Sequence, residues 1–297
     1  MRAGAASDTC CAPMEVGDAD RLLADRAVAA LRDELAAWPK PGLVSPVDRG
    51  SHRDMDFALM QRSAEALRAP FAALAAAGRA GASFEGGLLP LGIAAERRML
   101  QATGGVNTHR GAIFALGLTV AGLARAETVH GRVTPAILRT TLQAGWGAAL
   151  RTHAARGQAA LTHGARVRRE TGRGGARDEA ALGFPSVFDV GLPAHRAALQ
   201  AGLDANAARI QTLFALMAAV DDTTVLHRGG LEGAAFVRRA AARFLAEGGC
   251  HQPGWEGRGV ALHEAFVARN LSAGGCADLL ATTLLVAGST QEANSPP

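Results

Sequence analysis

Apolar residues recur at helical spacing along almost the whole chain, and this periodicity limits the fold more than any other feature. The segments that carry it are 20–37, 56–77, 89–102, 108–125, 134–153, 205–220, 230–246, 260–269 and 276–288. None shows the apolar–polar alternation of a half-buried strand. Alanine is abundant and tyrosine absent, and small side chains let helices pack closely. We expect an all-α fold, a compact multi-helix bundle with a polar cleft formed by the loops between helices.

The composition fits one globular domain. The chain has 297 residues, of which 48% are hydrophobic and 20% charged, enough for a sizeable core. We expect a single all-helical domain over 19–289. Residues 1–18 are small and polar, and 290–297 contain Asn-Ser-Pro-Pro, so both ends are predicted to be disordered tails.

Charge and cysteine content exclude several classes of partner. The net charge of +4 comes mostly from scattered arginines, without an aromatic platform for bases, so we expect no nucleic-acid partner. The cysteines lack metal-ligand spacing. Neither a leader nor an apolar run of membrane-spanning length is evident. A cytoplasmic protein without a membrane partner is therefore expected.

Polar islands interrupt the helical runs and carry the unusual residues. They are Trp38–Asp56, Thr103–Gly111, Thr171–Pro185, Val220–Gly230 and Arg269–Asp278. A helical bundle could gather them at one end or in one cleft. None of them matches a Walker A loop, a nucleophile elbow or a dinucleotide-binding glycine motif.

The island Thr103–Gly111 predicts an anion site at a helix start. Gly104 and Gly105 end one helix, and Asn107 is suited to cap the next. His109 and Arg110 would then lie in its first turn, where free N–H groups favour phosphates. An ordinary corner between two helices is the alternative.

The island Trp38–Asp56 combines rigidity with both signs of charge. Its prolines and glycines keep it out of a helix. Such a loop suits a site for polyphosphate and metal, and a solvated loop whose Asp54 or Asp56 caps the next helix is the alternative. The charged residues are Lys40, Asp48, Arg49, Arg53, Asp54 and Asp56, with His52 among them.

The island Val220–Gly230 places two adjacent carboxylates after an apolar helix. Asp221 and Asp222 repel each other, and at a helix C-terminus they would oppose the dipole. A divalent cation or nearby arginines would relieve that cost, so we favour a functional role. His227 and Arg228 could supply a base and a cation.

The last two islands are less decisive. In Arg269–Asp278, Ser272 could cap the last helix, while Gly274 and Gly275 would let a ligand approach the backbone. Asp278 would lie in the first turn, and a plainly capped helix is the alternative. The glycine–arginine segment 169–185 could be a lid over phosphates or a flexible connector.

Together, the islands resemble the triphosphoribosyl-dephospho-CoA synthase family. The resemblance rests on five ordered motifs and spans about residues 22–288. The motifs are Lys40-Pro-Gly-Leu-Val44, Gly50-Ser-His-Arg-Asp-Met-Asp56, Thr103-Gly-Gly-Val-Asn-Thr-His-Arg-Gly-Ala112, Asp222-Thr-Thr-Val-Leu-His-Arg-Gly-Gly230 and Asn270-Leu-Ser-Ala-Gly-Gly-Cys-Ala-Asp-Leu-Leu280. Ser45-Pro-Val before Asp48, together with the 172–185 segment, resembles the malonate decarboxylase branch more than the citrate lyase branch.

The resemblance implies an all-helical fold and a single reaction. The 5-triphosphoribosyl group of ATP would pass to the 2′-hydroxyl of 3′-dephospho-CoA, with release of adenine. The product is the precursor of the prosthetic group of an acyl-carrier subunit, and it would pass to a holo-acyl-carrier-protein synthase. A homodimer is left open.

The chemistry suggests roles for the motif residues. A carboxylate would stabilise the positive ribosyl transition state, and an imidazole would act as base. Our catalytic candidates are Asp54, Asp221, Asp222, His52 and His227. Those for substrate and phosphate binding are Lys40, Arg53, Asn107, His109, Arg110, Arg228, Ser272, Gly274 and Gly275. Mg²⁺ is expected with ATP, bound by Asp56, Asp222 and Asp278.

Two other functions remain open on the sequence. A Mg²⁺-dependent helical glycohydrolase would cleave an N-ribosyl bond with water, using the same carboxylates. A non-enzymatic helical scaffold would leave the islands exposed and dispersed.

Overall fold

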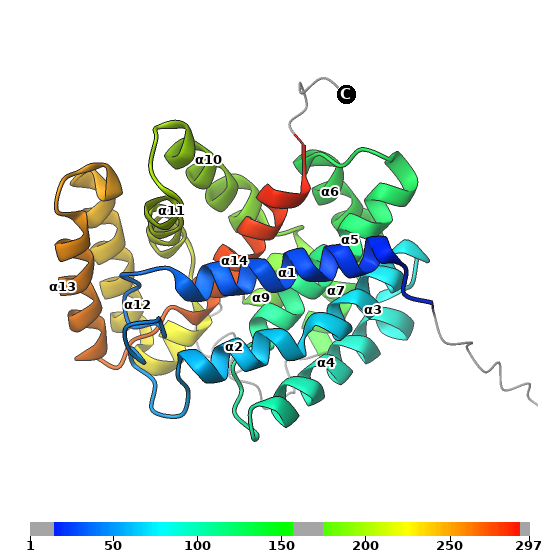
Figure 1. Cartoon of the computed structure of the whole chain (residues 1–297), viewed down its shortest axis with the longest axis horizontal. Coiled ribbons are helices and arrows are strands. Elements are labelled where there is room, and N and C mark those ends of the chain that lie inside the picture. The colour runs from blue at the N-terminus through cyan, green and yellow to red at the C-terminus, as the bar shows by residue number, and fades with distance from the viewer. Residues whose placement is uncertain (1–14, 157–174, 292–297) are drawn as a thin grey trace, which may run out of the picture.

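A computed structural model describes residues 15–156 and 175–291, and these residues form helices and loops without a strand. This confirms the all-α prediction. Figure 1 shows the arrangement of the helices. In chain order they are α1 (Asp18–Ala36), α2 (Phe57–Ala66), α3 (Arg68–Arg79), α4 (Leu89–Ala102), α5 (Arg110–His130), α6 (Pro135–Leu142), α7 (Ala148–Arg156), α9 (Ala176–Ala181), α10 (Leu192–Gln200), α11 (Ala205–Ala219), α12 (Thr223–Ala246), α13 (Trp255–Val267) and α14 (Gly274–Ser289).

Short turns of other helix types join several of these helices. Three π-helical turns, η1 (Phe84–Leu88), η2 (Gln143–Gly147) and η4 (Ser186–Gly191), lead into α4, α7 and α10. A 3-10 turn, η5 (Gly249–His251), lies between α12 and α13. The predicted tail over 1–18 ends one residue late, because α1 starts at Asp18. Residues 1–14 and 292–297 of the two predicted tails lie outside the described part.

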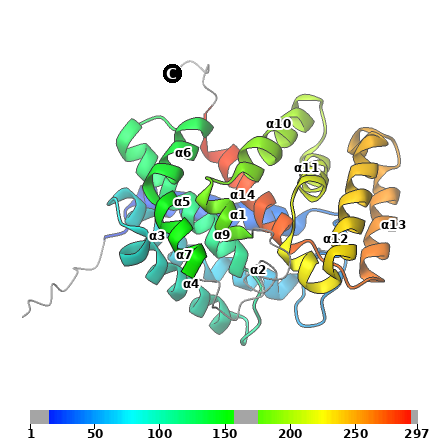
Figure 2. The ribbon, with the colours of Figure 1, turned by 180° about the vertical axis from the view of Figure 1, so that it is seen from behind.

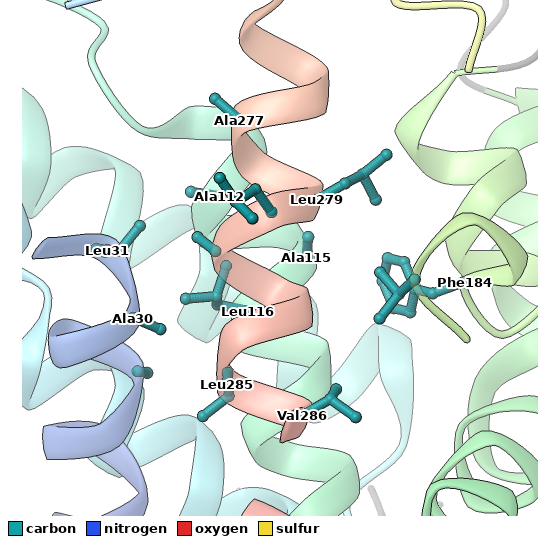
Figure 3. Packing of buried hydrophobic residues seen from close by; sticks show 14 of the residues in the cluster. Ala30, Leu31, Ala112, Ala115, Leu116, Phe184, Ala277, Leu279, Leu285 and Val286 are labelled. Carbon is teal, nitrogen blue, oxygen red and sulfur yellow. The ribbon is translucent and has the colours of Figure 1, made fainter. Parts of the chain in front are cut away.

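Two apolar helices, α5 and α14, form the centre of the molecule. Leu116 on α5 and Leu280 on α14 are fully buried, and α1 and α3 pack against this pair. Figure 3 shows α14 between α1 and the buried Phe184, with α5 behind it. One cluster of buried hydrophobic residues extends from α1 to α14.

Small side chains allow α3 and α5 to cross closely, as the alanine content predicts. A methyl group at Gly78 of α3 would lie 2.1 Å from the carbonyl oxygen of Ala121 on α5. Real carbon–oxygen contacts exceed 3 Å, so only glycine fits at this crossing.

α5 has the length and mean hydropathy of a membrane-spanning helix, but 72% of its apolar window is buried inside the structure. That burial is typical of the core helix of a globular protein.

The predicted helix 56–77 is two helices, because Pro70 lies near the start of the second. Proline has no N–H, and its ring crowds the carbonyl four residues earlier, here that of Ala66. α2 therefore ends at Ala66 and α3 begins at Arg68.

The helical segment 186–200 was not predicted from the sequence. Gly191 and Pro193 there resemble helix breakers, yet Pro193 occupies the first turn of α10. Proline is tolerated at that position because the first-turn N–H groups have no partner within the helix.

The helix predicted over 230–246 is the second part of α12, and a first helical part from Thr223 precedes it across a kink at Gly230, where φ is 60°. α12 and α13 lie side by side at one end of the molecule, and α6 lies at the other (Figure 1, Figure 2). The loop between α1 and α2 approaches the start of α12 (Figure 1), which places two of the polar islands next to each other.

Candidate active site

The loop between α1 and α2 packs directly on the segment before α14. Gly42 has φ 67°, and a methyl group there would lie 2.0 Å from the carbonyl oxygen of Leu271. Ser51 Oγ donates a hydrogen bond of 2.6 Å to the same oxygen. Gly50, with φ 54°, folds back onto Gly42 and Leu43. The glycines of the first two motifs are thus needed for close approach.

Arg228 of α12 connects these segments. Its guanidinium donates to the Ser51 carbonyl oxygen at 2.8 Å and to Asn270 Oδ1 at 3.1 Å. No carboxylate lies within ion-pair distance of it in the part of the chain that the structure describes. Burial lowers the pKa of Arg228, and the charge of Asp54 partly opposes this shift. A half-buried cation of this kind suits an anionic ligand.

His52 is held on both ring nitrogens. Arg228 Nη2 lies 3.2 Å from Nδ1, and Ser272 Oγ lies 2.9 Å from Nε2. A guanidinium can only donate, so Nδ1 accepts and the proton of the neutral ring is on Nε2. Burial and the charge of Arg228 lower the pKa of His52 to about 4. His52 is therefore neutral at pH 7 and has no free ring nitrogen for a substrate proton.

Asp222 stabilises the starts of two helices. Its Oδ1 accepts from the backbone N–H groups of Thr224 at 2.7 Å and Val225 at 3.2 Å, and its Oδ2 from that of Cys276 at 2.8 Å. Burial raises the pKa of Asp222, and these hydrogen bonds partly oppose that shift because they stabilise the charged form. The carboxylate lies at a helix N-terminus, where the dipole favours it, so the argument from an unfavourable C-terminus was wrong.

Asp221 points to a different partner. It forms an ion pair with Arg238, farther along α12. The two adjacent aspartates therefore avoid mutual repulsion through separate partners, N–H groups for Asp222 and a guanidinium for Asp221.

Asp278 lies against the start of α5. A methyl group at Gly111 would lie 1.9 Å from Asp278 Oδ2, and the backbone N–H of Ala112 donates to this carboxylate. Burial raises the pKa of Asp278 well above its usual range, and the charges of Glu34 and Asp222 add to the effect. Gly111 is thus required because a carboxylate from α14 occupies the place of its side chain.

Lys40 forms a buried ion pair. Its Nζ lies 2.6 Å from Glu34 Oε1 and 2.8 Å from the Glu34 carbonyl oxygen, and both side chains are at least 94% buried. Burial lowers the pKa of Lys40, while Glu34 opposes that shift. Lys40, which we predicted to bind phosphate, is therefore paired with the carboxylate of Glu34 on α1.

His109, not Asn107, is the N-cap of α5, and its side chain makes no capping bond. Its Nδ1 lies 2.7 Å from Ser63 Oγ, which lies 2.7 Å from Thr108 Oγ1. Nε2 is buried and has no hydrogen-bond partner among the residues that the structure describes. Burial and the charge of Lys40 lower the pKa of His109 to about 4, so a neutral imidazole is oriented by two hydroxyl groups.

The other predicted residues lie around this core. Arg53, Asp54 and Asn107 are exposed, and His227 is half-buried on α12. Arg110 Nε pairs with Glu96 at 2.9 Å. Ser272 does not cap α14 but contacts His52, and α14 starts at Gly274, beside Thr224. Gly275 packs against Asp222.

Comparison with known proteins identifies the family of the chain. Residues 20–296 match the family CitG, described as ATP:dephospho-CoA triphosphoribosyl transferase. The chain belongs to this family. A protein of Pectobacterium atrosepticum named 2-(5″-triphosphoribosyl)-3′-dephosphocoenzyme-A synthase is 44% identical over 270 residues, which cover 88% of this chain and 87% of that protein. A probable synthase of the same name from Azotobacter vinelandii is 43% identical over 267 residues, 89% of each chain. No solved structure matches the chain.

Within the described residues, the three predicted magnesium ligands are each engaged in a structural contact. Asp56 caps α2 through Leu59 N–H at 2.9 Å and pairs with Arg49. Asp222 and Asp278 lie at other helix starts, as described. No group of three or more His, Cys, Asp or Glu residues is placed to hold a metal ion within 15–156 and 175–291. The aspartates do not fit a shared ion, although Mg²⁺ commonly binds through substrate phosphates and waters.

Three residues of the candidate site were not predicted from the sequence. Glu34 lies inside a regular helical pattern, so periodicity marks it only as part of α1. Ser63 likewise belongs to α2, and no local signal distinguishes it from an ordinary core serine. Asn270 has φ 54° and follows a helix that ends at Val267, so its type and place could have indicated a left-handed turn.

The predicted lid is described only in part, since residues 169–174 lie outside the described ranges. Residues 176–181 form α9, Phe184 is buried in the core, and Gly175 packs against Thr223 at the start of α12. The described half of this segment is therefore packed structure next to the site.

Proposed function

We propose that the chain transfers the 5-triphosphoribosyl group of ATP to the 2′-hydroxyl of 3′-dephospho-CoA and releases adenine. The membership of the transferase family supports this reaction. The structural observation that supports this reaction most is the contact network of His52, Arg228 and Ser272. These residues come from three of the family-like motifs, which are far apart in the sequence.

The reaction breaks the bond between the ribose C1′ of ATP and adenine, and forms a bond from C1′ to the acceptor 2′-oxygen. The 2′-hydroxyl proton goes to a base, and adenine leaves with a proton. The ribosyl group becomes positive on the way, so a carboxylate facing it lowers the barrier.

The structure separates the candidate residues that can reach a substrate from those that are held by contacts within the protein. Asp54 is exposed, and its charge acts on both His52 and Arg228. We therefore assign Asp54 the role of stabilising the positive ribosyl group. Asp222 and Asp278 position helix starts. Arg228 and the exposed Arg53 face the triphosphate. His227 is the remaining base candidate, since both nitrogens of His52 are engaged.

The malonate decarboxylase pathway is our proposal for the biological role, based on Ser45-Pro-Val before Asp48. The citrate lyase counterpart is the alternative. Deletion of the gene should leave the acyl-carrier subunit of malonate decarboxylase without its prosthetic group, detected by mass spectrometry. A normal modification of that subunit would contradict the assignment. We further propose a cytoplasmic location, Mg²⁺ carried by ATP and transfer of the product to a holo-acyl-carrier-protein synthase.

The direct test is adenine release from ATP and Mg²⁺ by the purified protein, with and without 3′-dephospho-CoA. We expect release only with the acceptor, and an acceptor product heavier by one triphosphoribosyl group. Release without the acceptor would indicate a glycohydrolase. No release under either condition, from a folded protein, would indicate a binding or scaffold role.

A further inference from the structure

An apolar pocket lies between α3, η1, α4 and α5, and its lining residue Glu96 pairs with Arg110 at the start of α5. Among its lining residues, Leu74, Phe84 and Ile113 are buried, and Gly92 and Phe114 are half-buried. The pocket holds ≈ 450 Å³ of empty space, including its open mouth. Since this volume includes open solvent, the enclosed part can take only a narrow segment of a substrate and not a whole nucleotide.

The pocket is continuous with the start of α5. Glu96, its charged lining residue, accepts a hydrogen bond from Arg110 Nε at 2.9 Å, and Arg110 follows His109 directly. The residues that α5 contributes, from Ile113 to Leu118, lie about 5–12 Å along the axis from Arg110, given a rise of ~1.5 Å per residue. A ligand with a charged group at Arg110 could thus extend along α5 into the pocket.

We propose that this pocket binds the pantetheine arm of 3′-dephospho-CoA. The inference rests on the proposed function, which supplies the acceptor. The arm is the one uncharged chain in either substrate, rich in methylene and methyl groups, and a diphosphate joins it to the reacting ribose. That diphosphate would lie at Arg110. The methylene and methyl groups of the arm suit the apolar lining side chains, and its amides and hydroxyl would lie toward Glu96 and the open mouth.

Gly92 gives the test. A methyl group at this position of α4 meets no atom within 4 Å, so a longer side chain can fill the pocket without a clash at its first carbon. Leucine is also a better helix former than glycine, and Gly92→Leu should fold. The matched control is Gly257→Leu on α13, an exposed helical glycine that likewise has open space around it.

For Gly92→Leu we expect the KM for 3′-dephospho-CoA to rise at least tenfold, with the KM for ATP within twofold of wild type. Gly257→Leu should leave both unchanged. In the wild-type enzyme, pantetheine alone should inhibit competitively against 3′-dephospho-CoA and not against ATP, a result that does not depend on the variant folding.

An unchanged KM for 3′-dephospho-CoA in folded Gly92→Leu would overturn the proposal. So would an equal rise in both KM values, or inhibition by pantetheine that competes with ATP. Failure of the proposed function is a separate outcome, because the wild-type protein would then show no acceptor-dependent release of adenine.

Discussion

At the scale of single residues, Asp222 and Asp54 illustrate two uses of a carboxylate in one site. Asp222 is buried and accepts backbone N–H groups from two helices, whereas Asp54 is exposed. Asp222→Ala should lower the free energy of unfolding by about 1–4 kcal/mol, since it removes caps at two helix starts and each lost cap costs ~0.5–2 kcal/mol. Urea denaturation measures this.

The matched variants separate structure from chemistry. Asp221→Ala removes a partly exposed ion pair with Arg238, and the loss of this pair should cost less than ~1 kcal/mol. Asp54→Ala should keep its stability and lose at least ~100-fold in kcat, as loss of an electrostatic group in a site does. Full stability of Asp222→Ala would show that its hydrogen bonds are not what holds α12 and α14 in place.

His109 predicts a pH dependence of stability. Its pKa is about 4 in the folded protein against a usual 6.5, so the unfolded chain binds the proton more tightly. The stabilisation is present above pH 6.5 and is lost as the pH falls through the folded pKa. His52 acts in the same direction.

His109→Asn should therefore flatten the fall in unfolding free energy between about pH 6.5 and 4. Asparagine can still bond Ser63 but cannot titrate. Urea unfolding at steps of pH measures the slope. An identical slope in the variant and the wild type would mean that folding does not lower the pKa of His109.

At the scale of helices, the crossing of α3 and α5 depends on Gly78. Gly78→Ala should cost about 1–3 kcal/mol because an added methyl group forces two packed backbones apart. Gly257→Ala, on the exposed face of α13, should instead raise stability by roughly 0.5–1 kcal/mol, the ordinary gain of alanine over glycine in a helix. Thermal unfolding of the two variants would test this, and equal shifts would show that the crossing is not tight.

Helix prediction succeeded where local rules act alone. Leu89–Ala102 has the bounds expected from its periodicity, and Gly104 and Gly105 adopt positive φ after it, as predicted. It failed where a breaker residue is tolerated by position, as with Pro193 in the first turn of α10. Proline and glycine act through position in the helix, which periodicity does not report.

At the scale of the whole molecule, Gly42 lets the loop between α1 and α2 contact the segment before α14. Gly42→Ala places a methyl group 2.0 Å from the Leu271 carbonyl oxygen, so the loop 39–56 cannot dock on the segment before α14. We expect adenine release to fall at least ~100-fold, as when reacting groups are misplaced by about 1 Å. The helical far-UV circular dichroism signal should remain.

The control for backbone strain is Gly81→Ala. Gly81 also has positive φ, 72°, but open space around it, so this variant should lose about 1–2 kcal/mol of stability and keep its activity. Equal activity of Gly42→Ala and Gly81→Ala would argue against the docking of the two segments as the basis of the site.

The sequence by itself determined that the chain is helical, because a 3.6-residue period is a local property that each segment carries alone. Its motifs also indicated the family. Only the tertiary structure decided which residues meet: His52 contacts Ser272, 220 positions away, and Asp278 lies against Gly111. Such contacts depend on how helices pack. A carboxylate that caps two helices and one that faces solvent therefore have the same sequence signature, and burial alone separates their roles.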